Sequence, residues 1–434
     1  MVQFLQFSLL IFQLILAFLV GYLLLLTITA FVARRRTEGV ERTPTHRFLF
    51  LVPAHNEEKL LPLTVQNLQA VDYPDNLFDI HVVADNCTDD TAVLARKEGA
   101  VVHERFNDEK RGKGYALQWL LQLLWETEEP HDAIIIVDAD TIVSPNFLQV
   151  MDVRLANGER VIQSYYAVRD PGNSWSVGLR YAALAVLHYL RPQGRMVLGG
   201  SAGLKGNGMV FTADLIKQHE WSASITEDIE FHMNLILDGE RVMFAPDAVV
   251  EAEMPNSLED SETQNERWEQ GRVEMMKTYV PKLLKGSGKA LTQGEFGRAY
   301  LLFDATMEHI IPPFSILAAL SGLSLMAACV LLFTGEWILN YLPFLAPVAV
   351  DTTLAAQLRI INLALGIFII LGQMIYLLSG LKLAKAPKNI YKQLLYIPFF
   401  MLWKIWLYIR VLFGRDQEEW VRTARNEDQV TQEL

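Results

Sequence analysis

Two aspartates, Asp138 and Asp140, stand two residues apart directly after the apolar run 134–137. A short apolar run of this kind predicts a buried strand, and if the extended backbone continues, both carboxylates project on one side. Mg²⁺ and Mn²⁺ prefer carboxylates, which they combine with phosphate oxygens of a substrate. The pair therefore predicts a metal site for a diphosphate, although alone it would also suit a turn or a helix start.

A second acidic pair, Glu227 and Asp228, follows Thr226. A carboxylate within hydrogen-bond reach of a hydroxyl group can act as its general base, and we expect Asp228 to have this role. The same residues would also suit the start of a helix, with Thr226 as N-cap and negative charges in the first turn. Both interpretations are compatible, because a helix start can also aim the base.

The segment ArgGlyLysGlyTyrAla, residues 111–116, precedes a helical pattern. Backbone N–H groups and an ammonium group at the start of a helix can hold phosphate. The segment does not fit the P-loop pattern of ATPases, in which Ser or Thr follows the Lys, because Gly114 and Tyr115 stand there. A basic surface turn is the alternative.

Four motifs occur in one order along the chain. They are ValProAlaHisAsnGluGlu at 52–58, ValAspAlaAspThr at 137–141, ThrGluAsp at 226–228, and Gln264, Arg267 and Trp268 in a Gln-x-x-Arg-Trp pattern. Flanked by membrane-length apolar segments, this order resembles the membrane-integrated family 2 glycosyltransferases, which include cellulose, chitin and hyaluronan synthases and ceramide glucosyltransferases. The resemblance covers about residues 52–268 and, more loosely, the C-terminal apolar segments.

The resemblance implies a GT-A-type, Rossmann-like α/β domain that binds a UDP-sugar with Mg²⁺ or Mn²⁺. In this family Asp138 and Asp140 would hold the metal, Asp85 would accept from uracil, and Asp228 would be catalytic. The residues expected at the nucleotide sugar are Pro53, His55, Glu57, Asp85, Lys113, Asp138, Asp140 and Arg267. The residues expected at the acceptor are Gly206, Asn207, Gly208, Glu227, Gln264 and Trp268.

The resemblance also implies inverting transfer to a membrane-associated acceptor. The Gln-x-x-Arg-Trp pattern favours a growing polysaccharide, whereas a ceramide-type lipid glycosyltransferase with a similar pattern is the alternative. A polysaccharide channel made from about three spans would be small or would need a second copy of the chain. Two further alternatives are a membrane-bound nucleotidyltransferase, which would release pyrophosphate, and a nucleotide-sugar sensor without activity.

The elements that must position these residues follow from apolar patterning. Three apolar runs, 48–52, 80–84 and 134–137, predict buried strands. The segments 60–68, 91–97 and 115–124 between them have helical spacing. Alternation of this kind predicts a parallel sheet covered on both faces, with ligands at the carboxyl ends of the strands. We expect this domain at residues 45–285, followed by a loop at 285–289.

Residues 4–32, 310–333 and 354–381 are apolar enough and long enough to span a bilayer. Basic residues follow the first and third spans, and the positive-inside rule places these ends in the cytoplasm. They are Arg34, Arg35, Arg36, Lys382, Lys385, Lys388 and Lys392. A cleaved signal peptide is a weaker interpretation of the first span, because its charges follow the apolar core.

The apolar stretch 394–413 contains Lys404 and Arg410 among aromatic residues, which is typical of a helix lying in the headgroup region. The segment 175–190 has a similar composition. We therefore expect an N-terminal anchor at 1–33 and a C-terminal membrane region at 286–434 with two spans, an interfacial helix and a cytoplasmic tail. The expected location is the inner membrane of a bacterium, with the catalytic domain in the cytoplasm.

The overall composition limits the possible partners. The chain has 434 residues, a mean hydropathy of +0.19 and a net charge of −12. An acidic chain without a stripe of Lys and Arg cannot displace the counterions from nucleic-acid phosphates. We therefore expect no nucleic-acid partner. The only two cysteines, Cys87 and Cys329, exclude a disulfide framework and a cysteine zinc site.

Overall fold

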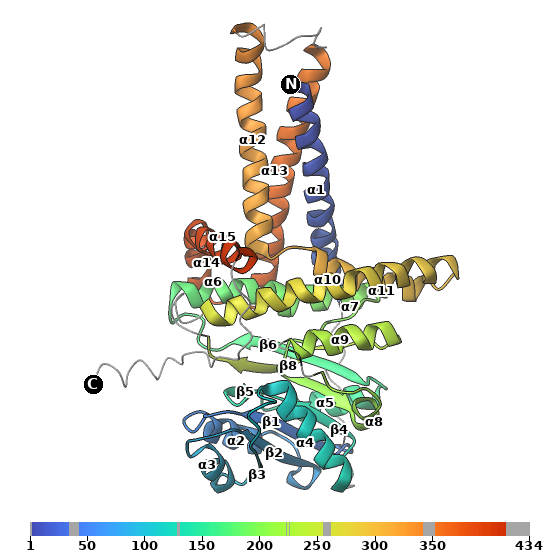
Figure 1. The fold of residues 1–434 in the computed structure, drawn as a ribbon, viewed down its shortest axis with the longest axis vertical. Helices are drawn as coiled ribbons and strands as arrows, with labels where there is room; N and C mark the ends of the chain where they lie inside the picture. The colour runs from blue at the N-terminus through green and yellow to red at the C-terminus, as the bar shows by residue number, and fades with distance from the viewer. Residues whose placement is uncertain are drawn as a thin grey trace, which may run out of the picture.

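The computed structural model describes residues 2–33, 43–127, 131–222, 224, 226–254, 262–341 and 352–413. Its lower part in Figure 1 contains a mixed eight-stranded sheet of strand order β3-β2-β1-β4-β7-β6-β8-β5. The strands are β1 (Phe48–Ala54), β2 (Phe78–Asp85), β3 (Val101–Arg105), β4 (Ala133–Ile136), β5 (Thr141–Val143), β6 (Val161–Val168), β7 (Met209–Thr212) and β8 (Met243–Ala252).

Strands β1 to β4 run parallel, and the three strands predicted from apolar runs are confirmed. The expectation of a wholly parallel sheet is wrong, because β7 is antiparallel to both β4 and β6, and β5 is antiparallel to β8. The chain leaves the carboxyl end of β6 for a layer of helices and re-enters the sheet from that end. A strand that returns in this way lies antiparallel to the one before it.

Helices cover both faces of the sheet, as expected. Helices α2 (Leu61–Gln69), α3 (Thr91–Lys97) and α5 (Phe147–Ala156) contribute to the core on one face. Helices α4 (Lys113–Thr127), α8 (Ala213–Gln218) and α9 (Glu227–Asp238) contribute to the core on the other. Strand residues such as Phe48 and Leu49 point alternately into these two cores and are almost fully buried.

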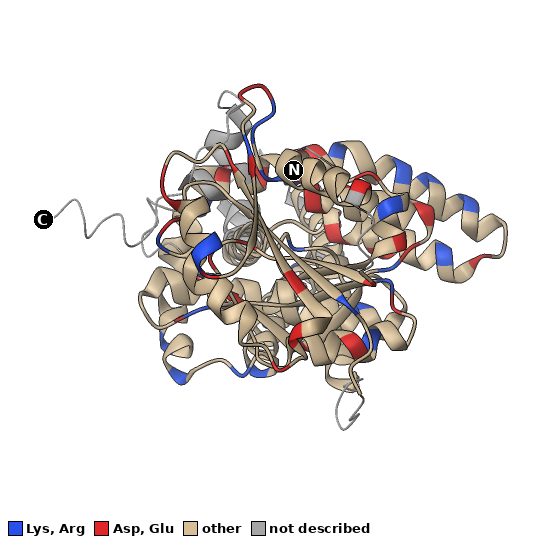
Figure 2. Cartoon of the chain, turned by 90° about the horizontal axis from the view of Figure 1, so that it is seen from below, with Lys and Arg blue, Asp and Glu red and all other residues tan. Residues whose placement is uncertain are grey.

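A layer of helices separates the sheet from three long helices (Figure 1). It contains α6 (Trp175–Leu184), the π-helical segment η2 (Ala185–Leu190), α7 (Arg191–Leu198), α10 (Glu262–Thr292), α11 (Phe296–Ile310), α14 (Lys388–Gln393), η4 (Leu394–Tyr396) and α15 (Ile397–Phe413). Helices α10 and α11 form a hairpin that projects beyond the sheet, with Lys and Arg along the projecting part (Figure 2). This layer lies between the sheet and the three long apolar helices.

The prediction of a loop at 285–289 is wrong, because α10 continues as a helix to Thr292. Gly286 in this stretch serves packing rather than a turn. A Cβ at Gly286 would lie 3.1 Å from the side chain of Leu302 on α11, so glycine lets the two helices approach closely. The expected domain boundary at 285/286 therefore falls inside one continuous helix.

The three long helices are α1 (Val2–Val32), α12 (Phe314–Tyr341) and α13 (Thr352–Leu383), which pack together (Figure 1). Within the described residues, they are the helices that are long and apolar enough to cross a membrane, and they match the three predicted spans. Pro312 and Pro313 separate α11 from α12, because proline cannot continue the helix before it. Arg34, Arg35 and Arg36 lie outside the described residues.

Candidate active site

The carboxyl ends of β1, β2 and β4 border a cavity of about 1550 Å³. The loops after β1 and β2 are joined by hydrogen bonds: His55 Nδ1 lies 2.7 Å from the carbonyl oxygen of Asp85. In addition, the backbone N–H of Glu57 donates to Thr91 Oγ1 at 2.8 Å. Pro53, His55, Glu57 and Asp85 all line the cavity, which is where the sequence analysis expects the nucleotide; their contact with it stays a prediction.

Asp85 has a counterion that the sequence analysis did not identify. Arg105, at the end of β3, forms an ion pair with Asp85, and the side chains are only 5% and 8% exposed. The same guanidinium donates to the carbonyl oxygen of Lys110 at 2.7 Å. Arg105 therefore fixes Asp85 and the loop that leads to Lys113.

Lys113, the first residue of α4, joins two parts of the site. Its Nζ lies 2.5 Å from Asp138 Oδ1 and 2.6 Å from the carbonyl oxygen of Gly206. Burial alone would lower the pKa of Lys113, but Asp138 and Glu227 raise it above its ordinary value. The ammonium group thus stays charged between the aspartate motif and the loop before β7.

Asp138 and Asp140 lie in a turn rather than on an extended strand. The backbone N–H of Thr141 donates to the carbonyl oxygen of Asp138 at 3.2 Å, which closes the turn between β4 and β5. Both aspartates nevertheless line the cavity. The turn and the binding interpretation of these residues are therefore compatible.

Asn207 positions this turn from beneath. Its side chain is fully buried, its Oδ1 accepts from the backbone N–H of Asp138 at 3.2 Å, and its Nδ2 donates to Thr141 Oγ1 at 2.8 Å. The neighbouring Gly208 has φ +64°, and a Cβ there would lie 2.0 Å from Ser164 Oγ on β6. Both residues serve the internal packing of the site, and the acceptor contact expected of them stays a prediction.

Glu227 and Asp228 form the first turn of α9 and line the same cavity. A Cβ at Gly206 would lie 3.3 Å from Asp228 Oδ2, so the loop before β7 passes close to this carboxylate. Burial raises the pKa of Glu227 to about 7, with Lys113 opposing and Asp228 supporting the rise. Burial also raises the pKa of Asp228, against Lys113 and Lys205. Two carboxylates of increased basicity therefore face Lys113.

Helix α10 supplies Trp268 to the cavity wall, where its side chain is 45% exposed. Gln264 and Arg267 lie on the same helix, but their side chains are outside the described part of the structure. At its far end the cavity becomes apolar, with Phe314, Leu377 and Phe400 from α12, α13 and α15. One cavity thus connects the acidic residues with the base of the long helices.

The match to the family model described as Glycosyltransferase like family 2 spans residues 44–271, more than half of the 434-residue chain. The chain belongs to glycosyltransferase family 2. The matched range contains the motifs from His55 to Trp268.

Curated relatives of this glycosyltransferase include lipid and polysaccharide enzymes. It is 28% identical over 308 residues to a beta-monoglucosyldiacylglycerol synthase of Nostoc sp., covering 66% of this chain and 63% of that protein. It is 19% identical over 285 residues to the probable glucomannan 4-beta-mannosyltransferase 14 of Arabidopsis thaliana, covering 62% of this chain and 52% of that protein. The chain thus spans less than two thirds of the length of these relatives.

Among solved structures, a mannosyltransferase of Pyrobaculum calidifontis in complex with GDP-mannose and Mn²⁺ has a similar fold. The TM-score is 0.50 and the identity 17%, with 88% of this chain and 99% of that chain covered. The likeness confirms the predicted GT-A-like α/β fold.

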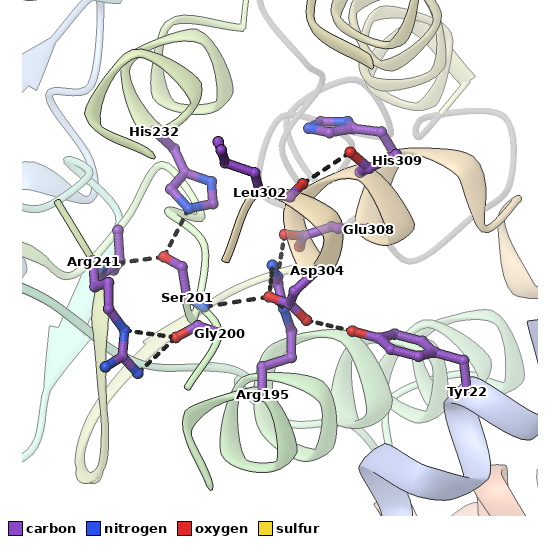
Figure 3. Close-up of polar contacts among 12 residues, drawn as sticks. Tyr22, Arg195, Gly200, Ser201, His232, Arg241, Leu302, Asp304, Glu308 and His309 are labelled. Atoms are coloured by element: carbon purple, nitrogen blue, oxygen red, sulfur yellow. Dashed lines mark hydrogen bonds and ion pairs between the residues drawn. The ribbon is translucent and has the colours of Figure 1, made fainter. Parts of the chain in front are cut away.

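An ion-pair network that the sequence analysis missed borders the cavity at Glu308 (Figure 3). Arg195 on α7 donates to Asp304 Oδ2 at 2.8 Å and also pairs with Glu308, both on α11. Glu308 Oε1 lies 3.1 Å from Nζ of Lys205, the residue before Gly206. Burial alone would raise the pKa of Glu308, but Arg195 and Lys205 hold it well below its usual range. The network therefore fixes Lys205 in the loop before β7.

The residues of this glycosyltransferase fit a divalent cation at the aspartate turn. Asp138 and Asp140 are two hard oxygen donors that are partly exposed in the cavity, and Lys113 already places one positive charge against Asp138. No group of three or more metal-binding side chains occurs among the described residues. A site with two carboxylates leaves coordination positions for phosphate oxygens and water, which suits Mg²⁺ or Mn²⁺.

Proposed function

We propose that this glycosyltransferase moves a sugar from a UDP-sugar to a hydroxyl group on the headgroup of a membrane lipid, with inversion at the anomeric carbon. The observation that carries the proposal is the single cavity that runs from Asp138 and Asp228 to an apolar end beside Phe314 and Leu377. A lipid could place its chains among the long helices and its headgroup next to the carboxylates. A soluble acceptor would have no use for the apolar end.

Asp228 is the general base in this proposal. The acceptor oxygen forms a bond to the anomeric carbon while the bond from that carbon to the diphosphate oxygen breaks, and UDP leaves with the electron pair. The hydroxyl proton passes to the carboxylate of Asp228. Because one displacement occurs at one carbon, its configuration inverts.

Lys113, Asp138 and Asp140 hold the donor. The ammonium group of Lys113 offsets the negative charge of the diphosphate, and the two aspartates would hold Mg²⁺ or Mn²⁺. Such a cation, when bound, neutralises charge that develops on the leaving phosphate. Arg105 keeps the carboxylate of Asp85 in place at the end of the cavity where we expect the uracil.

A lipid acceptor is favoured over the growing polysaccharide that the Gln-x-x-Arg-Trp pattern predicts. The synthases of Nostoc and of Synechocystis sp. are named for a glucosylated diacylglycerol. The glucomannan enzyme of Arabidopsis is the more distant relative at 19% identity. Membership of the glycosyltransferase family removes the nucleotidyltransferase and the inactive sensor as alternatives.

The domain division supports the same function. We propose an anchor at 1–33, a catalytic domain at 45–285 on the cytoplasmic side of a bacterial inner membrane, and a membrane region at 286–434. UDP-sugars would reach the catalytic side from the cytoplasm. Helices α6, α7, α10 and α15 would lie in the headgroup region, which is where an acceptor hydroxyl must be presented.

Mass spectrometry of products tests the proposal. The purified full-length chain is incubated with a panel of UDP-sugars, Mn²⁺ and a bacterial lipid extract. We expect one lipid to gain a single hexose or N-acetylhexosamine and UDP to be released. A ladder of growing glycans would instead support the polysaccharide synthase, and release of pyrophosphate would contradict both.

A further inference from the structure

Helix α1 contacts the helical layer at two points near the active site. The hydroxyl group of Tyr22 donates to Oδ1 of Asp304 on α11 (Figure 3). One turn further along α1, the carbonyl oxygen of Leu26 would lie 2.3 Å from a Cβ at Gly194 on α7, so the two helix backbones approach closely. Both contacts flank Arg195, which donates to Asp304 Oδ2 at 2.8 Å. A helix of membrane-spanning length thus supports the ion-pair network in Figure 3.

This network leads from α1 to the cavity. The side chains of Arg195 and Asp304 are only 2% and 0% exposed, so water screens their attraction weakly. Arg195 also pairs with Glu308, and Glu308 Oε1 lies 3.1 Å from Nζ of Lys205. Glu308 and Lys205 both line the cavity. Lys205 belongs to residues 199–208, which connect α7 with β7 and which we name the α7–β7 loop.

The network holds the α7–β7 loop at two places. Near its start, the backbone N–H of Ser201 donates to Asp304 Oδ2 at 3.4 Å, and Ser201 Oγ lies 3.0 Å from His232 Nε2 on α9. Further along, Lys205 pairs with Glu308, one turn after Asp304 on α11. The loop is therefore attached to α11 by two carboxylates and to α9 by a histidine.

The α7–β7 loop also reaches Asp228. A Cβ at Gly206 would lie 3.3 Å from Asp228 Oδ2, and the carbonyl oxygen of Gly206 accepts from Lys113 Nζ at 2.6 Å. Gly206 has φ +76°, a conformation that suits glycine best. His232, which contacts Ser201, lies one helical turn after Asp228 on α9. The network thus touches both the loop and the helix that meet at Asp228.

We propose that Tyr22 and Glu308 are positioning residues: through the network in Figure 3 they hold the α7–β7 loop against Asp228, so that α1 is part of the active site as well as an anchor. The inference rests on the proposed function, in which Asp228 is the general base. A displacement of about 1 Å between reacting groups can cost about 10²-fold in rate. Loosening the loop should therefore lower kcat and leave donor binding nearly unchanged.

Lys205 provides a second observable, the pH dependence of transfer. Charged groups from several elements surround Asp228 in the cavity: Lys113 on α4, Asp138 after β4, Lys205 in the α7–β7 loop and Glu227 on its own helix. Burial raises the pKa of Asp228, and Lys113 and Lys205 oppose the rise. Lys205→Met removes one opposing charge, so the acidic limb of the pH–rate profile should move to higher pH. Lys205→Arg keeps the charge and should leave the limb in place.

The experiment uses the full-length protein in detergent. Transfer is measured as UDP release with Mn²⁺, lipid extract and the most active UDP-sugar of the panel, and donor-site binding by calorimetric titration with UDP. Tyr22→Phe should lower kcat by about tenfold and change the Kd of UDP by less than about twofold. Thr27→Val on α1 is the matched control: its hydroxyl group bonds within its own helix, to the carbonyl oxygen of Leu23 at 2.8 Å, so kcat should stay at the wild-type value.

A double variant tests whether Tyr22 and Glu308 act through one network. Glu308→Gln should also lower kcat, and combining it with Tyr22→Phe should cost little more than the more damaging single change, because residues of one network do not act independently. If Glu308→Gln unfolds, Lys205→Met combined with Tyr22→Phe makes the same comparison from the other side of the ion pair.

The inference is wrong if Tyr22→Phe keeps the wild-type kcat, if Thr27→Val loses as much as Tyr22→Phe, or if the single effects multiply in the double variant. An acidic limb that stays in place in Lys205→Met would also contradict it. Transfer by Asp228→Asn at the wild-type rate would instead remove the general base of the proposed function. An inactive Asp228→Asn beside a fully active Tyr22→Phe would remove only the inference, so the two failures are distinguishable.

Discussion

At the scale of single residues, the position of Asp228 suits the role of general base that we propose for it. It sits in the first turn of α9 beside Gly206, where burial raises its pKa. A base of higher pKa attracts the acceptor proton more strongly. Asp228→Asn keeps the shape but loses the proton acceptor, so we expect the transfer rate to fall by about 10² or more.

Steady-state kinetics together with titration of UDP-sugar binding would check this expectation. Binding of the donor should change by less than about twofold, since the amide keeps the volume of the side chain. A variant that transfers the sugar at the wild-type rate would place the base elsewhere.

The carboxylate pair also predicts the pH dependence. Asp228 must be ionised to act, so kcat/KM should fall as the pH drops below its raised pKa. The negative charge of Asp228 contributes to raising the pKa of Glu227 to about 7, so Asp228 ionises first and Glu227 is still neutral where Asp228 titrates. Glu227→Gln keeps this neutral state, so the acidic limb of the pH–rate profile should stay in place. A limb that moves to lower pH would show that Glu227 ionises before Asp228.

The aspartate turn predicts a metal requirement. Because Asp138 and Asp140 provide so few ligands, we expect Mn²⁺ to bind firmly only when UDP completes the coordination. Calorimetric titration of Mn²⁺ with and without UDP checks this. Asp140→Ala should abolish turnover, and EDTA should do the same to the wild type until Mg²⁺ or Mn²⁺ is added back. Full activity in EDTA would rule out a metal role.

The sequence predicted the site residues that belong to a short motif. It did not predict those whose partners are distant along the chain. Asp138 and Asp228 stand in local patterns that suggest chemistry by themselves. The partner of Asp85, in contrast, is Arg105 on another strand, 20 residues away. Lys205 and Glu308 are 103 residues apart. No spacing rule connects such pairs, because only the fold brings them together.

At the scale of elements, one glycine lets the start of α9 approach α10 closely. A Cβ at Gly271 would lie 2.1 Å from Cγ2 of Thr226, whereas a Cβ at Gly288, later on the same helix, would meet nothing within 4 Å. Gly271→Val should therefore destabilise the protein by about 1–3 kcal/mol and slow transfer, because it displaces the turn with Asp228.

Gly288→Ala is the matched control and should leave stability unchanged or raise it by up to about 1 kcal/mol, since alanine favours the helix. Thermal unfolding in detergent and kcat measure the two effects. Equal melting temperatures for both variants would show that α10 can move away from α9 without cost.

The elements themselves were predictable where periodicity was clear. Residues 48–52 are apolar because β1 is covered on both faces, and the sequence pattern carries that information directly. The direction of β7 could not be predicted, because the pattern of a four-residue strand fits parallel and antiparallel pairing equally well. The glycines at 286 and 288 suggested a loop. The contact that explains Gly286 is with Leu302 on the next helix, and the local sequence does not show it.

At the scale of the whole molecule, the charges around the long helices predict one orientation. Lys382 and Lys385 follow α13, and the positive-inside rule places them in the cytoplasm together with the sheet. Protease added to sealed right-side-out vesicles should therefore spare residues 43–298, whereas inverted vesicles should lose them. Cleavage of the sheet from outside the right-side-out vesicles would reverse the orientation.

Helix α1 makes polar contacts with helices that are synthesised much later. Asn362 on α13 donates to the carbonyl oxygen of Gln6 at 3.1 Å, and Tyr22 donates to Asp304 on α11. At about 5–20 residues per second, the ribosome needs roughly 16–64 s to make the ~320 residues between α1 and α13. In the proposed topology, α1 would spend that interval in the bilayer without the partners of its polar groups. The last long helix to be synthesised would then complete the packing of the first, and until then α1 would depend on an insertase or on the surrounding lipid.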